Sequence, residues 1–110
     1  MTTLDLNGIQ ISVPDDHLLL YIRRTLPDYA ENVGRAAAVV ERKYPGRGLV
    51  DVGANVGDTA AVVRSHTGLP ILSIEGSPYY FELLQANARS IDDVELECAL
   101  VDSVTACTVF

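Results

Sequence analysis

The sequence predicts an α/β domain, a partial doubly wound parallel sheet with an N-terminal β-hairpin and helices. From residue 48 onward, short apolar runs alternate with helical patterns. Strands and helices that alternate over short links favour a parallel sheet with right-handed crossovers. The first part of the chain instead carries a hairpin signal and two helical patterns. We therefore divide one compact domain into residues 1–47 and residues 48–110.

The N-terminal part begins with two short runs, residues 4–6 and 9–13, in which apolar and polar residues alternate. Asn7 and Gly8 lie between them. Both residues tolerate positive φ, so this pair is the strongest short signal for a β-hairpin.

Two helices are expected next, over residues 17–26 and residues 29–43. The acidic pair at positions 15 and 16 suits the start of the first helix, where the macrodipole is positive. A proline separates the two helices, and Asp28 is in position to cap the second one.

The second part of the chain supplies the sheet. Its expected elements are a buried strand at 48–52, a helix at 57–66, a strand at 71–74, a helix from Ser77, a strand at 94–101 and the start of another strand at 105–110. A complete doubly wound sheet has further strands on the far side of its first strand. We therefore expect a fragment, or a half-fold whose open side is covered by another chain.

The charge and cysteine content limit the partners and the location. The formal net charge is −7, which disfavours nucleic acid and anionic membranes as partners, since both need a positive surface. Cys98 and Cys107 form no CxxC pair and have no histidine at metal-ligand spacing, so no metal is expected. With no disulfide framework and no signal peptide, a cytoplasmic location is expected.

A glycine turn follows the first strand of the second part. Gly53 and Gly57 lie four residues apart with Asn55 between them, the general form of a nucleotide-cofactor loop. A dinucleotide site has a third glycine where this chain has Asp58, whose charge would repel a pyrophosphate. Asp51 adds a second negative charge. These carboxylates better suit the ammonium and sulfonium groups of S-adenosylmethionine.

Two acidic residues follow later strands. Glu75 ends the second strand, where a carboxylate can accept hydrogen bonds from ribose hydroxyls. Asp102 follows the third strand, near where an adenine edge would lie. Simpler interpretations stay open: the glycines serve only a turn, Asp58 only caps a helix, and Glu75 is a solvated strand end. His17 and His66 are expected at the surface, and no serine, cysteine or carboxylate partner is identified for either.

The segment from about residue 48 to residue 110 resembles the N-terminal part of an S-adenosylmethionine-dependent methyltransferase, and most closely the FkbM-type family with its Rossmann-like domain. The family's first motif resembles residues 50–59, including asparagine in place of the middle glycine. Later segments resemble residues 74–78, then Phe81, Leu84 and Asn87, and finally residues 99–102. The family usually has proline where this chain has Gly76.

The resemblance implies methyl transfer from S-adenosylmethionine to a hydroxyl group of a small molecule or sugar. It implies that Gly53, Asn55 and Gly57 shape the methionine side of the pocket, that Asp51 steadies the loop and that Glu75 binds ribose. The family's acceptor-binding half lies beyond residue 110. Catalysis is therefore expected only within a longer chain, and the catalytic residues stay unassigned.

Two other functions remain open. The chain could be a non-catalytic binding module that forms a homo-oligomer through the open edge of its first parallel strand. It could also be part of a dinucleotide-binding oxidoreductase, which Asp58 disfavours.

Overall fold

The computed structural model describes residues 1–102 of the chain. Within them the elements are β1 (Thr2–Leu6), β2 (Ile9–Val13), α1 (Leu18–Thr25), α2 (Glu31–Lys43), β3 (Leu49–Val52), α3 (Asp58–His66), β4 (Ile71–Glu75), α4 (Pro78–Ala88) and β5 (Val94–Cys98). Strands β3, β4 and β5 pair in that order as a parallel sheet, and β1 and β2 form a separate antiparallel hairpin. The predicted α/β class is confirmed.

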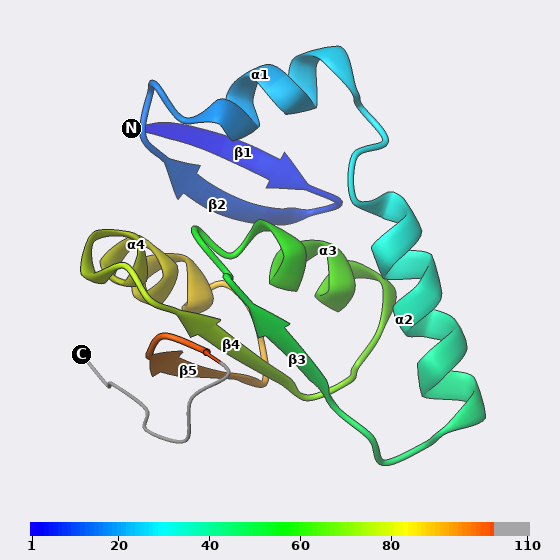
Figure 1. Ribbon diagram of the computed structural model, residues 1–110. Coiled ribbons are helices and arrows are strands. Elements are labelled where there is room, and N and C mark those ends of the chain that lie inside the picture. Colours follow the sequence, from blue (N-terminus) through cyan, green and yellow to red (C-terminus); the bar gives the residue numbers. More distant parts are fainter. Residues whose placement is uncertain (103–110) are drawn as a thin grey trace.

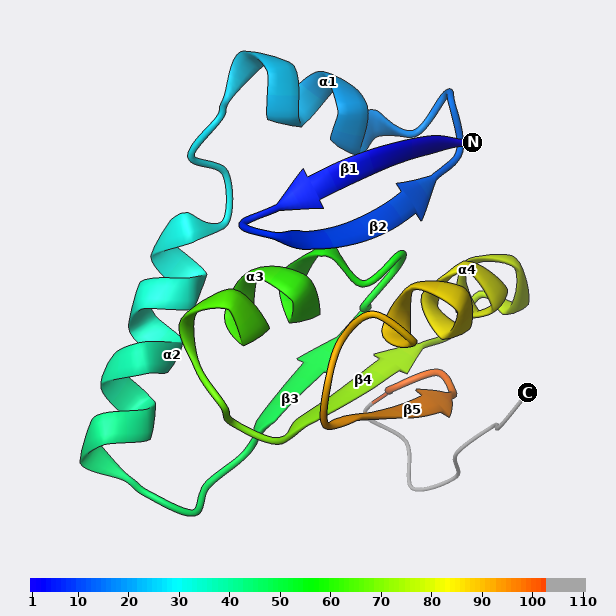
Figure 2. The same cartoon turned by 180° about the vertical axis from the view of Figure 1, so that it is seen from behind.

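The helices α3 and α4 form a middle layer. The hairpin lies on one side of them and the parallel sheet on the other, as both views show (Figures 1 and 2). No described element covers the opposite face of the sheet, where Val50 and Val52 are 60% and 59% exposed. The prediction of a buried first strand was therefore wrong for one of its two faces, because both crossover helices pack on the other.

The hairpin forms where the sequence predicts it. Asn7 and Gly8 have φ values of 57° and 94°, so two consecutive residues adopt the left-handed conformation that a tight hairpin turn needs. Leu6, Ile11 and Val13 are buried beneath the hairpin and belong to the hydrophobic core.

The first helix starts in a different way from the one expected. Its cap is His17, whose ring accepts a hydrogen bond from the amide of Leu19, and no acidic residue lies in the first turn. Asp15 instead accepts a hydrogen bond from Thr2 and pairs with the N-terminal ammonium group. The Asp15 carboxylate therefore binds the start of β1 and does not cap the helix.

The second helix begins two residues later than expected, at Glu31. Ala30 precedes it with φ 67°, and no side chain caps the helix. Asp28 contributes its backbone carbonyl, which accepts from the Glu31 amide in a turn. The prediction of an Asp28 cap was therefore wrong, because this turn separates Asp28 from the first helical residue.

The start of α4 lies where the sequence predicts it. Ser77 caps α4 by accepting from the Tyr80 amide, and Pro78 occupies the first turn. Strand β5, however, ends at Cys98 and not at residue 101. The last ladder bond runs from the Ala99 amide to the Glu75 carbonyl. The strand expected at 105–110 lies outside the described residues.

One hydrophobic core joins both parts of the chain. Its buried residues are Leu6, Ile11, Val13, Leu19, Ala37, Val56, Ala60, Ala61, Val63, Leu69, Ile71 and Ile91. The hairpin, both N-terminal helices and the sheet all contribute to this set. The hairpin and helices are therefore packed against the sheet segment as part of the same core. Cys98 is also buried, as expected for a small core residue.

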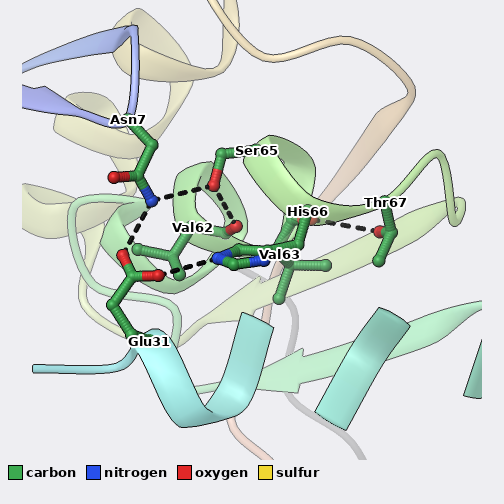
Figure 3. A network of polar contacts seen from close by, with 7 residues as sticks. All are labelled: Asn7, Glu31, Val62, Val63, Ser65, His66 and Thr67. Carbon is green, nitrogen blue, oxygen red and sulfur yellow. Dashed lines mark hydrogen bonds and ion pairs between the residues drawn. The ribbon is translucent and has the colours of Figure 1, made fainter. Parts of the chain in front are cut away.

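A polar network also fastens the N-terminal part to α3 (Figure 3). Glu31 contacts the His66 ring nitrogen Nε2 at 2.7 Å and accepts from the Asn7 amide at 2.7 Å, and that amide also donates to Ser65. These hydrogen bonds, from Asn7 first, lower the pKa of Glu31. Gly34 makes room for the contact, since a Cβ there would collide with the His66 ring. The prediction that His66 has no carboxylate partner was wrong.

Among residues 1–102, no helix combines the length and hydropathy needed to cross a membrane.

Candidate functional site

The loop between β3 and α3 has an unusual backbone that the sequence explains. Gly53, Asn55 and Gly57 have φ values of 78°, 53° and 95°. Glycine adopts positive φ without a steric penalty, and asparagine tolerates it better than most residues. A Cβ at Gly53 would meet no atom within 4 Å, whereas one at Gly57 would press on Leu84. The loop is thus open beside Gly53 and packed beside Gly57.

Glu75 organises this loop through its carboxylate. One oxygen accepts from the Asn55 amide at 2.7 Å, and the other accepts from the Ser77 amide at 2.8 Å. The side chain is buried, with 8% exposure. A carboxylate has about four lone-pair positions, so each oxygen keeps the capacity to accept another hydrogen bond. Glu75 therefore joins the β3–α3 loop to the start of α4 and still offers an acceptor to a ligand.

Two more carboxylates, those of Asp51 and Asp58, lie close to the loop and are partly withdrawn from solvent. Burial, followed by the charges of Asp58 and Glu75, raises the pKa of Asp51 to about 6. One Asp51 oxygen, Oδ2, is buried without a hydrogen-bond partner among the described residues, as is the hydroxyl of Ser73, its register partner on β4. Burial also raises the pKa of Asp58. A positively charged ligand would offset this repulsion.

The N-terminal part contributes a residue to the loop that sequence reasoning missed. The Nε2 atom of His17 lies 2.7 Å from the side-chain oxygen of Asn55. The ring also packs edge-on against Tyr80, with centroids 5.9 Å apart. Nothing in the sequence relates His17 to a loop residue 38 positions away. The sequence predicts His17 inside the first helix and at the surface, and no local signal relates it to the loop.

Three hollows surround the loop. The first, about 290 Å³, lies at the carboxyl ends of the strands, and its lining includes Val52, Gly53, Glu75, Leu100 and Val101. The second, about 230 Å³, is lined by His17, Tyr29, Gly53, Asn55, Asp58 and others. The third, about 490 Å³, lies beside His17, Asn55, Tyr79 and Tyr80. Ligands of parallel α/β sheets bind at this carboxyl end.

Most of the residues singled out in the sequence meet at this place. Asp51, Gly53, Asn55 and Gly57 lie in or beside the loop, and Glu75 bonds directly to it. Asp102 is exposed and follows Val101, the last residue in the lining of the first hollow. Because β5 ends at Cys98, Asp102 lies four residues beyond the strand instead of directly after it.

Solved structures resemble this arrangement. The N-terminal domain of EvdMO1, solved with SAH bound, matches with a TM-score of 0.58 and 22% identity over 93% of this chain. The tRNA (uracil-54, C5)-methyltransferase of Pyrococcus abyssi, in complex with S-adenosyl-L-homocysteine, matches with a TM-score of 0.57 and 16% identity over 96%. The trans-methyltransferase CalH, in complex with SAH, matches with a TM-score of 0.54 and 23% identity over 80% of this chain.

At these identities the likeness concerns the fold: this chain has the Rossmann-like fold of these methyltransferases. It spans 41% of the EvdMO1 domain and 26% of each of the other two proteins. Comparison of the sequence with family models and with curated proteins finds no match.

Proposed function

We propose that this chain is the cofactor-binding portion of an S-adenosylmethionine-dependent methyltransferase. The observation that carries the proposal is the loop of positive-φ residues bound to Glu75, beside the carboxylates of Asp51 and Asp58, whose pKa values burial raises. The structural neighbours solved with the demethylated cofactor support the same cofactor class.

The residues present fit this cofactor. The open side of Gly53 gives a ligand access to the backbone, because a Cβ there would extend into empty space. Glu75 has free acceptor capacity for ribose hydroxyls. The ammonium and sulfonium charges suit a site that holds a buried Asp51 oxygen with no hydrogen-bond partner in the described part of the chain. Leu100 and Val101 supply apolar surface for an adenine ring.

The bound cofactor supplies an electrophilic methyl group. This chain's residues would hold and orient it, with Gly53, Asn55 and Gly57 toward the methionine end and Glu75 toward the ribose. Positioning of the two reactants is a large part of such catalysis. The acceptor is proposed to be a hydroxyl group of a small molecule or sugar, as the FkbM-type resemblance implies. No residue of this chain is proposed as catalytic or as part of the acceptor site.

Calorimetric titration of the purified chain with S-adenosylmethionine and with NAD tests the proposal. Saturable binding of S-adenosylmethionine is expected. Glu75→Gln should weaken that binding by about 1–3 kcal/mol, since a buried acceptor and its charge are lost. The matched control, Glu97→Gln on the exposed face of β5, should leave it unchanged. Saturable NAD binding without S-adenosylmethionine binding would falsify the proposal.

The charge argument has its own test. S-adenosylhomocysteine lacks the sulfonium charge, so the ratio of the two dissociation constants reports how strongly the site favours a cation. Asp58→Asn should reduce the preference for S-adenosylmethionine over S-adenosylhomocysteine. An unchanged ratio would remove Asp58 from the electrostatics of the site.

A second candidate function is self-association. Strand β3 is an edge of the sheet within residues 1–102, and its exposed Val50 and Val52 form an apolar surface beside that edge. Edges of this kind pair with other strands. Light scattering at high concentration should then detect a dimer that Val50→Lys disrupts. A monomer at all concentrations would contradict this function without affecting the first one.

Partners and location are proposed from the composition of the chain. The acidic charge supports the absence of nucleic acid and membrane partners, and the cysteine pattern supports a cytoplasmic location.

A further inference from the structure

We propose that His17 is a positioning residue for the cofactor loop: its imidazole holds Asn55 in the conformation in which the loop binds a ligand. The proposal rests on the proposed function and deepens it. It gives the N-terminal part of the chain a direct role in the site, through a residue that does not belong to the motif at residues 50–59.

The hydrogen bonds define the state of the ring. The Leu19 amide donates to Nδ1 at 3.0 Å, so Nδ1 acts as an acceptor and carries no proton. The proton of the neutral ring is then on Nε2, which donates to the Asn55 oxygen at 2.7 Å. The edge-on contact with Tyr80 fixes the plane of the ring. One imidazole thus caps α1 and holds the loop.

Asn55 needs such a partner because of its backbone. Its φ of 53° is rarely adopted by residues other than glycine. Its amide donates to Glu75, and its side chain contacts His17. Asn55 is therefore held at both ends, by the acid proposed to bind ribose and by the cap of α1.

His17 and Asn55 also lie together between two of the hollows beside the loop. His17 and Asn55 both line the hollow that includes Asp58 and Thr59. They also both line the larger hollow beside Tyr80. The two hollows therefore meet at this hydrogen bond. Release of Asn55 would change the shape of both and loosen the loop at the proposed methionine end of the cofactor.

Two substitutions separate the positioning role from the capping role. His17→Asn keeps a side chain that caps helices well but is too short to reach Asn55 in the same way. Asn55→Gly keeps the positive φ and removes the acceptor. The matched control is His66→Asn, which breaks the contact with Glu31 on the opposite end of α3 and leaves the loop intact.

The first measurement is amide hydrogen exchange in the ligand-free chain. Exchange at the residue 55 amide should rise about threefold to tenfold in His17→Asn, as expected for the loss of one hydrogen bond. His66→Asn should leave it unchanged relative to the rest of the core. This readout depends on loop order and does not require cofactor binding, so it decides the positioning role even if the proposed function fails.

The second measurement is the dissociation constant for S-adenosylmethionine. Each single variant should bind about threefold to tenfold more weakly, and the double variant should bind no more weakly than Asn55→Gly alone. Unchanged exchange in His17→Asn, unchanged affinity in that variant, or effects that add in the double variant would each overturn the inference. If the wild-type chain binds no S-adenosylmethionine, the proposed function fails, whereas unchanged exchange in His17→Asn defeats the positioning role alone.

Discussion

Asn87 offers a sharp test of how the hairpin, the loop and α4 hold together. The side chain is 5% exposed. Its oxygen accepts from the Ser12 amide at 2.8 Å, and its nitrogen donates to the carbonyls of Ser12 at 2.9 Å and Val56 at 2.8 Å. One carboxamide therefore joins β2 to the end of the cofactor loop from a position on α4.

Asn87→Ala removes all three hydrogen bonds and leaves their partners without a replacement from this side chain. Each bond contributes about 0.5–1.5 kcal/mol, and an unsatisfied buried group adds to the cost. We expect a loss of about 2–4 kcal/mol in the free energy of unfolding. For a domain of this size that loss corresponds to a melting temperature lower by about 10–20 °C. Total stabilities are only about 5–15 kcal/mol, so a large fraction would be lost.

Urea denaturation followed by circular dichroism measures this loss. The control is Asn32→Ala on the exposed side of α2, which should change the free energy of unfolding by less than about 0.5 kcal/mol. If Asn87→Ala lowers the free energy of unfolding by less than about 1 kcal/mol while the control is unchanged, the reasoning is refuted. Water would then replace the three hydrogen bonds that the side chain makes.

Three further predictions concern charge and space. Asp51→Asn should remove a decline in stability between about pH 4 and pH 6, because the raised pKa of Asp51 makes its ionisation unfavourable in the folded chain; parallel profiles of urea denaturation for both proteins would contradict this. Glu31→Gln should lower the free energy of unfolding by about 0.5–1 kcal/mol at pH 7. Because the pKa of Glu31 is lowered on folding, this loss should disappear as the pH falls below the carboxylate range, whereas the exposed control Glu82→Gln should have little effect at any pH. Gly76→Ala should destabilise the chain by about 1 kcal/mol, since a Cβ there would displace the end of Leu100 and lie 3.1 Å from the Ala99 carbonyl oxygen; an unchanged melting temperature would show that both neighbours move aside freely.

Gly76 lies directly after β4, at a position where the tertiary structure leaves little room for a side chain. Leu100 packs over the glycine, and any side chain at this position would have to displace it. This restriction comes from a residue 24 positions later in the chain, in a segment that lies against the end of β4.

The sequence by itself determined the elements whose signals are local. Asn7 and Gly8 specify the hairpin turn, Ser77 and Pro78 specify the start of α4, and Gly53 and Gly57 specify a turn with positive φ. The proximity of the loop and Glu75 also followed, because parallel strands end at the same edge of a sheet.

Tertiary structure alone decided which side chains meet from distant positions. The contact between His17 and Asn55 spans 38 residues, and that between Glu31 and His66 spans 35. Sequence periodicity describes one element at a time, whereas these contacts depend on how α1 and α2 pack against the loop and α3. The same packing buries Oδ2 of Asp51 without a hydrogen-bond partner among residues 1–102, and this burial raises the pKa of a carboxylate that the sequence shows only as a charge.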